Sequence, residues 1–266
     1  MHAIVCIKQV PDTTDVKINP ETNTLIREGV ASIINPFDTY AIEEGLRLKE
    51  RFGGKVTVIT MGPPQAREAL KEAVAMGADD AILLTDRAFA GSDTWATAYT
   101  LSQAIRRLAP FDIILCGKQA IDGDTGQVGP GIARQLRIPQ LTYVSRLVEI
   151  DPASARIRVE RLLEEGREIV DCTLPALLTV VKDINQPRYP TFLGIRRATR
   201  MEIPVWDSQA LPEANPEYLG LKGSPTQVVR IFHPPARSGR ATLLTGDTPA
   251  QIAAQLADRL LADKVI

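Results

Sequence analysis

The chain has 266 residues, a net charge of -1, three cysteines and two histidines. This length supports one large domain or two small ones, while the balanced charge argues against a nucleic-acid surface and the two histidines argue against a histidine-based metal site or a Ser-His-Asp triad. Isolated cysteines without a Cys-x-x-Cys motif indicate a reducing compartment. Because the sequence shows no apolar run of membrane-spanning length, we expect a cytoplasmic protein without membrane insertion.

The first half of the chain alternates strand and helix signals. Residues 3–10 and 55–60 are rich in β-branched residues, which favour strands. The Asn35-Pro36-Phe37-Asp38 sequence predicts a helix start, with Asn35 as N-cap and Asp38 complementing the helix dipole. The other predicted elements are a hairpin over 16–27, helices ending at 53–54, near 77 and at 108, and strands over 81–85 and 111–116. This alternation predicts a doubly wound, Rossmann-like α/β fold with a mostly parallel sheet.

A glycine-rich loop follows the strand at 111–116. It carries Gly117, Gly123, Gly126 and Gly129 and leads into a helix with Pro130 near its first turn. Such a loop lets backbone N–H groups approach an anion, and the helix N-terminus adds donors and partial positive charge. The loop has neither a Gly-Lys-Ser/Thr nor a Gly-x-Gly-x-x-Gly motif. From the loop alone, a nucleotide site and a plain surface loop are equally good interpretations.

Beyond residue 139 the pattern changes to closely spaced strands. We expect strands at 141–150, 155–163, 167–172 and 176–181, and connections this short favour an antiparallel extension at the sheet edge. Residues 182–240 show little periodicity and much proline, glycine and arginine, and a structureless loop of this length is usually functional. The last segment, 248–265, predicts an amphipathic helix with a Thr248 cap, packed on a partner chain or on its own core.

Several segments, taken together, resemble the beta subunit of electron-transfer flavoproteins. The run Val5-Cys6-Ile7-Lys8-Gln9-Val10-Pro11-Asp12 is similar to the first strand of that family. Three further segments match its pattern: Asn35-Pro36-Phe37-Asp38, Thr60-Met61-Gly62-Pro63 and Gly117-Lys118-Gln119-Ala120-Ile121-Asp122. Residues 183–198, which contain Pro187-Arg188-Tyr189, resemble the family's signature and recognition loop. The resemblance covers most of the chain.

The resemblance implies an adenine-nucleotide site in this subunit and a heterodimer with an alpha subunit that carries FAD. With Gly62 added from its strand-to-helix turn, the candidate cofactor-binding residues are Cys6, Asn35, Pro36, Phe37, Asp38, Met61, Gly62, Ala120, Ile121, Asp122, Gly123, Asp124, Thr125, Gly126, Gln127, Val128, Gly129, Pro130 and Gly131. We expect Thr125, Gln127 and Val128 to contact phosphate. Asp122 and Asp124 are expected to shape the loop, because carboxylates there would repel phosphate.

The recognition loop, about 183–200, is expected to dock a partner. The candidate docking residues are Arg188, Tyr189, Phe192, Leu193 and Ile195. The family typically places leucine where Phe192 stands, so the identity of this partner stays open. We expect residues 1–205 to form the nucleotide-binding domain, and residues 206–266 to form an extended arm and a C-terminal helix that pack on the partner subunit.

The loop from Asp122 to Pro130 resembles the electron-bifurcating group of the family, because small residues follow Asp122. That group holds FAD in this subunit and takes hydride from NADH. We therefore expect FAD here, with electrons passing to ferredoxin or flavodoxin and, through the alpha-subunit FAD, to an acyl-CoA dehydrogenase-like or quinone oxidoreductase partner. Two alternatives stay open: a simple carrier that holds structural AMP, and a non-redox adenine-nucleotide enzyme or sensor. We expect no acid–base catalytic residue and no metal.

Overall fold

The computed structural model describes residues 1–12, 18–19, 24–25, 32–229 and 241–265. The chain divides into two units, Met1–Arg230 and Ile231–Ile266. The second unit contains helix α6 (Pro249–Ala262), whose first turn is capped by the Thr248 hydroxyl as predicted. Among the described residues, no helix is long and apolar enough to cross a membrane.

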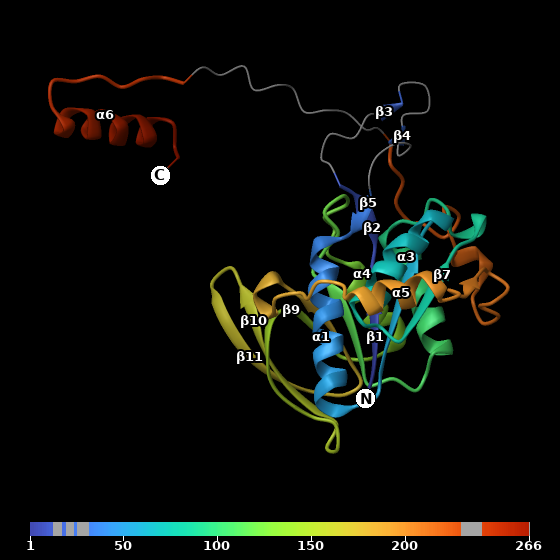
Figure 1. The fold of residues 1–266 in the computed structure, drawn as a ribbon. Helices are drawn as coiled ribbons and strands as arrows, with labels where there is room; N and C mark the ends of the chain where they lie inside the picture. The colour runs from blue at the N-terminus through green and yellow to red at the C-terminus, as the bar shows by residue number, and fades with distance from the viewer. Residues whose placement is uncertain (13–17, 20–23, 26–31, 230–240, 266) are drawn as a thin grey trace. The chain divides into compact units, whose positions relative to one another are not determined.

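The first unit is built on a nine-stranded, mostly parallel sheet (Figure 1). Its strand order is β11-β10-β9-β12-β8-β1-β6-β7-β13. The strands are β1 (His2–Cys6), β6 (Lys55–Met61), β7 (Asp80–Leu84), β8 (Ile113–Gly117), β9 (Gln140–Asp151), β10 (Arg156–Leu163), β11 (Gly166–Thr173), β12 (Ala176–Val180) and β13 (Val205–Trp206). The predicted α/β class is confirmed.

Helices cover both faces of this sheet, because its central strands are buried on both sides. Helices α1 (Pro36–Phe52) and α2 (Arg67–Met76) share a core with Val5 of β1. Helices α3 (Thr94–Arg107) and α4 (Val128–Leu136) share the opposite core with Ile4. Successive side chains of a strand point to opposite faces, so β1 anchors both cores. The doubly wound arrangement follows.

The order of the strands reverses between β1 and β8. From β1 the chain proceeds to β6 and β7 on one side, whereas β8 pairs with β1 on the other side, and all these pairs are parallel. Ligands of open α/β sheets bind outside the carboxyl ends of the strands at such a reversal. The ends of β1 and β8 therefore mark the expected site.

The edge extension was predicted correctly in part. Strands β9, β10 and β11 pair antiparallel, as expected. Strand β12, however, pairs parallel with both β8 and β9, so its assignment to the antiparallel extension was wrong. The hairpin excursion through β10 and β11 returns the chain to the start of β9, where Leu177 lies beside Gln140. The excursion thus replaces the helix that usually connects parallel strands.

Three other expectations change in detail. The first predicted strand is divided into β1 and β2 (Gln9–Pro11), and β2 pairs with β5 (Ser32–Ile34). The hairpin predicted over 16–27 is present as β3 (Ile18–Asn19) paired with β4 (Thr24–Leu25), while its turn lies outside the described residues. The segment predicted to be structureless contains α5 (Phe192–Arg200). Short 3-10 turns complete the fold at Pro64–Ala66, Arg87–Phe89, Lys182–Ile184 and Pro216–Tyr218.

Residues 206–229 belong to the first unit. Leu211 and Leu219 are buried in the core on the α3 side. The Asp86 carboxylate accepts hydrogen bonds from the Ser208 N–H and hydroxyl at 2.9 and 2.6 Å. Asp93, the N-cap of α3, also accepts from the Thr226 N–H at 3.0 Å. The boundary expected at 205/206 therefore falls inside the first compact unit.

Candidate functional site

Three strand ends meet at the sheet reversal. The Ile7 N–H, just beyond β1, donates to the Ile59 carbonyl of β6 at 3.0 Å, and the Thr60 hydroxyl donates to the Ile7 carbonyl at 2.8 Å. On the other side, Cys6 and Cys116 are register partners in β1 and β8. These strand ends therefore converge at one edge of the sheet and form the floor of the candidate site.

The cysteine pair at this edge is buried. Cys6 and Cys116 are both free, and both side chains pack in the core on the α3 and α4 face. Their mutual hydrogen bond, together with burial, raises the pKa of the Cys116 thiol. Since the thiolate is the reactive form of cysteine, the Cys116 thiol is a weak nucleophile, and the two buried side chains supply a small, apolar floor.

Asn35 holds the loop that follows β8. Its Oδ1 accepts from the Ile121 N–H at 3.1 Å, and its Nδ2 donates to the Gln119 carbonyl at 2.8 Å. Asn35 is the N-cap residue of α1, as predicted, but its side chain makes no capping bond to the helix. The amide is 1% exposed and is committed to loop backbone more than 80 residues away in sequence.

Asp38 joins the exits of β1 and β8. One carboxylate oxygen accepts from the Lys8 N–H at 2.7 Å and the other from the Gly117 N–H at 3.1 Å. Burial raises the pKa of Asp38 to about 7, against the lowering effect of Asn35 and the two backbone donors. A Cβ at Gly117 would overlap Asp38 Oδ1, so only glycine permits this approach.

The loop from Ala120 to Gln127 is exposed and internally braced. Asp122 pairs with Lys8 Nζ at 2.6 Å, and Asp124 accepts from Gln119 Nε2 at 2.7 Å. Both carboxylates therefore brace the loop through Lys8 and Gln119. Gly126 has a φ of 62°, a left-handed conformation that favours glycine. Thr125 and Gln127, the expected phosphate contacts, are exposed at the start of α4.

Helix α4 approaches the sheet closely because glycines face its neighbours. A Cβ at Gly129 would lie 2.7 Å from Thr179 Cγ2 of β12, and one at Gly131 would lie 2.7 Å from Ala98 Cβ of α3. The first-turn N–H groups of a helix lack partners within the helix and carry partial positive charge. These glycines thus set the start of α4, at Val128, over the ends of β8 and β12.

The other predicted residues lie around the same edge. Met61 ends β6 and packs, partly buried, on the α3-side core. The Gly62 N–H donates to the Leu84 carbonyl at 3.0 Å. Pro36 begins α1, and the Phe37 ring lies 5.1 Å from Lys118 Nζ. The structure therefore brings the candidate residues from β1, β6, β8 and the start of α1 to one edge.

Sequence reasoning missed Lys8 as a residue of the candidate site. Its N–H bonds Asp38 and its ammonium pairs with Asp122, so one residue joins the exit of β1 to two parts of the site. The sequence feature that could have identified Lys8 is its position, because this charged residue directly follows the apolar run of residues 3–7. Gln119, which holds both Asn35 and Asp124, was likewise missed.

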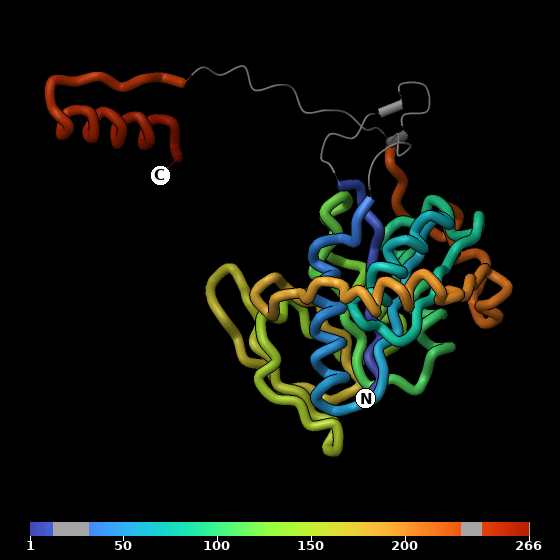
Figure 2. Tube along the Cα trace, viewed as in Figure 1, coloured from blue at the N-terminus to red at the C-terminus, as the bar shows by residue number. Residues whose placement is uncertain are grey.

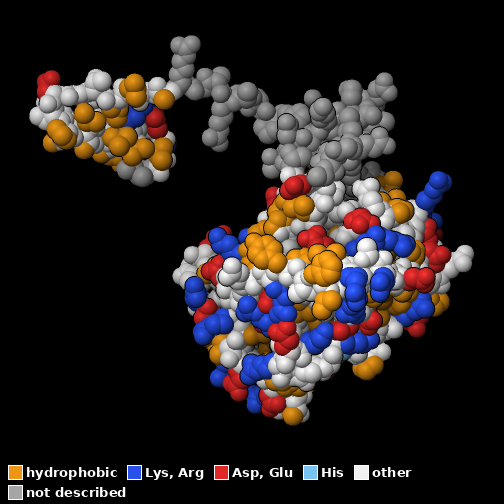
Figure 3. Space-filling view, in the orientation of Figure 1, with side chains coloured by type: hydrophobic (Ala, Val, Ile, Leu, Met, Phe, Trp, Pro, Cys, Tyr) orange, Lys and Arg blue, Asp and Glu red, His pale blue; other side chains and the backbone are white. Residues whose placement is uncertain are grey.

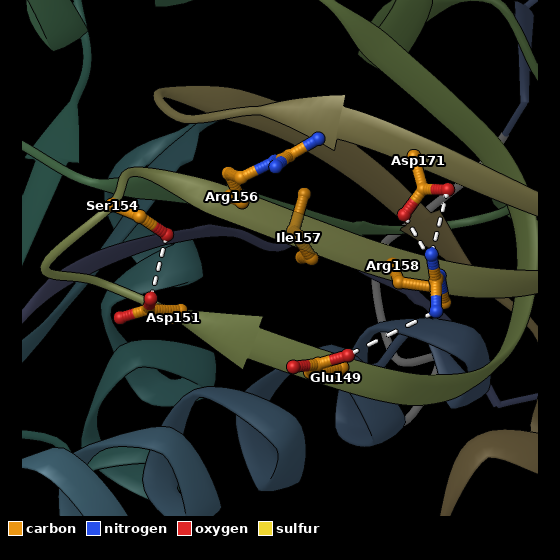
Figure 4. A pocket seen from close by; sticks show the side chains of 7 residues that line it. All are labelled: Glu149, Asp151, Ser154, Arg156, Ile157, Arg158 and Asp171. Carbon is orange, nitrogen blue, oxygen red and sulfur yellow. Dashed lines mark hydrogen bonds and ion pairs between the residues drawn. The ribbon is translucent and has the colours of Figure 1, made fainter.

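A separate hollow of about 240 Å³ lies on the antiparallel extension (Figure 4). Figure 4 shows Arg158 directed at Asp171, to which it donates two hydrogen bonds at 2.8 and 3.0 Å. Glu149 lies 4.0 Å from the same guanidinium. The lining contains none of the predicted cofactor-binding residues, and its charges are largely paired. This hollow is therefore distinct from the candidate nucleotide site.

The predicted docking residues divide into two groups. Tyr189, Phe192, Leu193 and Ile195 are exposed, with Tyr189 at 92% and Phe192 at 80%. On the face that carries α5, Figure 3 shows hydrophobic side chains lying among Arg and Lys side chains. Arg188 instead bonds Glu43 and Glu50 of α1, so its charge holds the segment to its own chain.

Figure 2 traces the 182–200 segment across α1, and its helix α5 packs on α2. Asn185 Nδ2 donates to the Tyr40 carbonyl at 3.0 Å and to Glu44 at 2.9 Å. Further along, Gly194 lies so close to the Ala75 carbonyl that a Cβ there would overlap it. The segment is therefore anchored by polar contacts on one side of its apolar residues and by helix packing on the other.

Comparisons with known proteins agree with this architecture. A family model described as "Electron transfer flavoprotein domain" matches residues 22–211. The chain is 52% identical to Protein FixA of Azotobacter vinelandii over 92% of this chain and 88% of that protein. It is 50% identical to the electron transfer flavoprotein subunit beta of Megasphaera elsdenii, over the full length of both. It is also 48% identical to the caffeyl-CoA reductase-Etf complex subunit CarD of Acetobacterium woodii, again over both full lengths. The chain belongs to the electron transfer flavoprotein beta-subunit family.

Proposed function

We propose that this chain binds FAD at the ends of β1, β6 and β8 and takes part in NADH-driven electron bifurcation. The observation that carries the proposal is the glycine-rich start of α4. Gly129 allows the helix to sit tightly on the sheet and Gly131 allows it to pack closely on α3, and the preceding loop has small residues at Gly123 and Gly126. Backbone N–H groups at such a helix start suit a pyrophosphate.

The residues present fit a dinucleotide. A Cβ placed at Gly123 meets no atom within 4 Å, so the outer side of the loop is open. Lys8 and Gln119 engage the loop carboxylates, which reduces their repulsion of phosphate. A bound FAD would supply the hydride-accepting flavin. The chain would bind its phosphates at Thr125, Gln127 and Val128 and orient it over the Cys6 floor.

The runner-up is a simple electron carrier that holds structural AMP at the same edge. The same helix start suits one phosphate as well as two. Membership of the electron transfer flavoprotein family, however, argues against the third possibility, a non-redox nucleotide enzyme or sensor. The name of one relative, the caffeyl-CoA reductase-Etf complex subunit, supports a role in a larger redox assembly.

We propose two contact regions for partners. Tyr189, Phe192, Leu193 and Ile195 form an exposed apolar group, which suits docking to an acyl-CoA dehydrogenase-like or quinone oxidoreductase partner. Helix α6 has no buried residue and is amphipathic, so we assign it and the arm before it to the alpha subunit. Ferredoxin or flavodoxin is the proposed low-potential acceptor.

The test is to release the nucleotides from the co-purified alpha–beta complex and to identify them by mass and absorbance. Two FAD and no AMP per heterodimer are expected. Flavin reduction by NADH in the same preparation completes the test of bifurcation. One FAD with one AMP would overturn the FAD assignment in favour of the carrier, and the absence of NADH-dependent flavin reduction would refute the bifurcating role.

A further inference from the structure

We propose that Asp38 and Asn35 are positioning residues, which fix the spacing between the exit of β1 and the loop after β8 without contacting the nucleotide. The inference rests on the proposed nucleotide site and changes the role of these two residues within it. The resemblance of the sequence to the family implied that both residues contact the nucleotide. In the structure both side chains are almost fully buried and engage backbone groups of the site itself.

The four hydrogen bonds form one hub. Asp38 bonds the N–H groups of Lys8 and Gly117, which belong to neighbouring strand exits. Asn35 bonds Gln119 and Ile121, which lie at the start of the glycine loop. The Asn35 N–H also donates to the Lys8 carbonyl at 2.8 Å. The start of α1 therefore holds the β1 exit and the loop start in a fixed relation.

The loop beyond this hub has few other anchors in the core. Residues 121–125 are exposed, and the bonds of Asp122 and Asp124 go to Lys8 and Gln119. These two partners are themselves held by Asp38 and Asn35. Every described side-chain brace of the loop thus leads back to the same two residues. A nucleotide that needs several loop N–H groups in register depends on this hub.

Asp38→Asn is the sharpest test, because it preserves shape and replaces one acceptor oxygen with a donor. One of the two N–H groups, Lys8 or Gly117, then faces an NH₂ group. Asp79→Asn is the matched control. Asp79 also accepts a backbone N–H, from Val56 at 2.9 Å, and a lysine, Lys49 Nζ at 2.7 Å, but at the amino ends of the strands.

The assay uses the full chain in complex with its alpha subunit. Dissociation constants are measured for FAD and separately for AMP, together with amide hydrogen exchange over 117–127 and thermal unfolding. Since leaving a buried donor unpaired removes a strong hydrogen bond, we expect Asp38→Asn to weaken nucleotide binding about tenfold or more. Exchange over 117–127 should accelerate. Asp79→Asn should lower thermal stability but change the dissociation constants less than about threefold. Asp79 lies at the amino ends of the strands, away from the candidate site at their carboxyl ends, and distant sites are energetically nearly independent.

Gly117→Ala disturbs the same contact from the other side and carries the test if Asp38→Asn does not fold. The double variant should weaken binding no more than the stronger single variant, since both remove one interaction. Unchanged binding in Asp38→Asn and Gly117→Ala would overturn the positioning role, as would an equal loss in Asp79→Asn. If the unaltered complex binds neither FAD nor AMP, the proposed function fails. Hydrogen exchange over 117–127 then tests the positioning role by itself: faster exchange in Asp38→Asn supports the role, and unchanged exchange overturns it.

Discussion

Arg188 offers the strongest test of how the docking segment is held. Its guanidinium donates to Glu43 at 2.8 and 3.1 Å and to Glu50 at 3.2 Å. The backbone N–H of Arg188 also donates to the Glu43 carboxylate at 3.2 Å. Arg188→Met keeps an unbranched apolar stem and removes the guanidinium with its charge and hydrogen bonds. We expect this change to loosen residues 182–191 from α1 and to destabilise the chain.

The magnitude follows from the burial of the two partners. Glu43 has a side chain only 4% exposed, so its hydrogen bonds to a charged donor contribute about 1.5–3 kcal/mol. Glu50 is 57% exposed, and its pair contributes about 0–1 kcal/mol. Arg47, 2.8 Å from Glu43, remains and limits the loss. A total near 2–3 kcal/mol corresponds to a fall in Tm of roughly 5–10 °C for a unit of this size.

The assay is thermal unfolding of the complex, with Glu50→Gln and Arg196→Met as controls. Arg196 lies on the same segment and is exposed, so its replacement should shift Tm by less than about 2 °C. Burial raises the pKa of Glu43, but Arg188 and Arg47 outweigh it and hold this pKa below its ordinary value. The Glu43 contribution is thus present above pH 4.5 and is lost as the pH falls through the folded-state pKa. A Tm for Arg188→Met within 1 °C of the unaltered protein at pH 7 would refute the reasoning.

Three further predictions concern the site and the docking group. Burial raises the pKa of Asp38 from 3.8 to about 7, so its contribution to stability is full below about pH 4 and is lost as the pH rises through 7. The change is at most about 4 kcal/mol. Urea unfolding from pH 4 to 8 should show this decline, and Asp38→Asn should abolish it; an identical pH dependence in both proteins would contradict the assignment. Gly129→Ala places a Cβ 2.7 Å from Thr179 Cγ2 and should cost about 1–3 kcal/mol and weaken FAD binding. Gly123→Ala, where the added Cβ meets nothing within 4 Å, is its control for stability alone, and equal losses of stability in the two variants would count against the close approach of α4. Phe192→Ala should weaken binding to the proposed dehydrogenase-like partner at least tenfold without changing Tm, because Phe192 is 80% exposed. Leu163→Ala, on the antiparallel extension, should leave partner binding unchanged, and retained affinity in Phe192→Ala would remove this residue as an anchor.

The local elements were predictable because their signals are local. Runs of β-branched residues predict strands such as β6, and Asn35-Pro36 predicts the start of α1. Thr248 caps α6 as expected, and Asp93, a residue type favoured at this position, caps α3. Each of these signals depends on residues within one or two helical turns, where side-chain hydrogen bonding and φ preferences act directly.

Helix α5 was missed because its signals are weak and partly tertiary. The segment has Thr191 as N-cap, with its hydroxyl accepting from the Gly194 N–H at 3.0 Å. Its apolar residues Phe192, Leu193 and Ile195 point away from the core, and only Ala198 is buried. A glycine within the helix disfavours it by propensity. Packing explains this glycine, because Gly194 lies against the Ala75 carbonyl of α2, a contact that sequence periodicity does not reveal.

The roles of Asn35 and Asp38 show where sequence reasoning stops. A local pattern correctly placed both at a helix start, since Asn-Pro at this position is typical of one. It also suggested a local use, capping and dipole complementation, because those are the uses visible within four residues. The actual partners of their side chains are Lys8, Gly117, Gln119 and Ile121, between 30 and 86 residues away. A buried polar group must find a partner, but the identity of that partner is set by the strand order. Only when β1 and β8 are known to be neighbours does the Asn-Pro-Phe-Asp sequence become the connection between them.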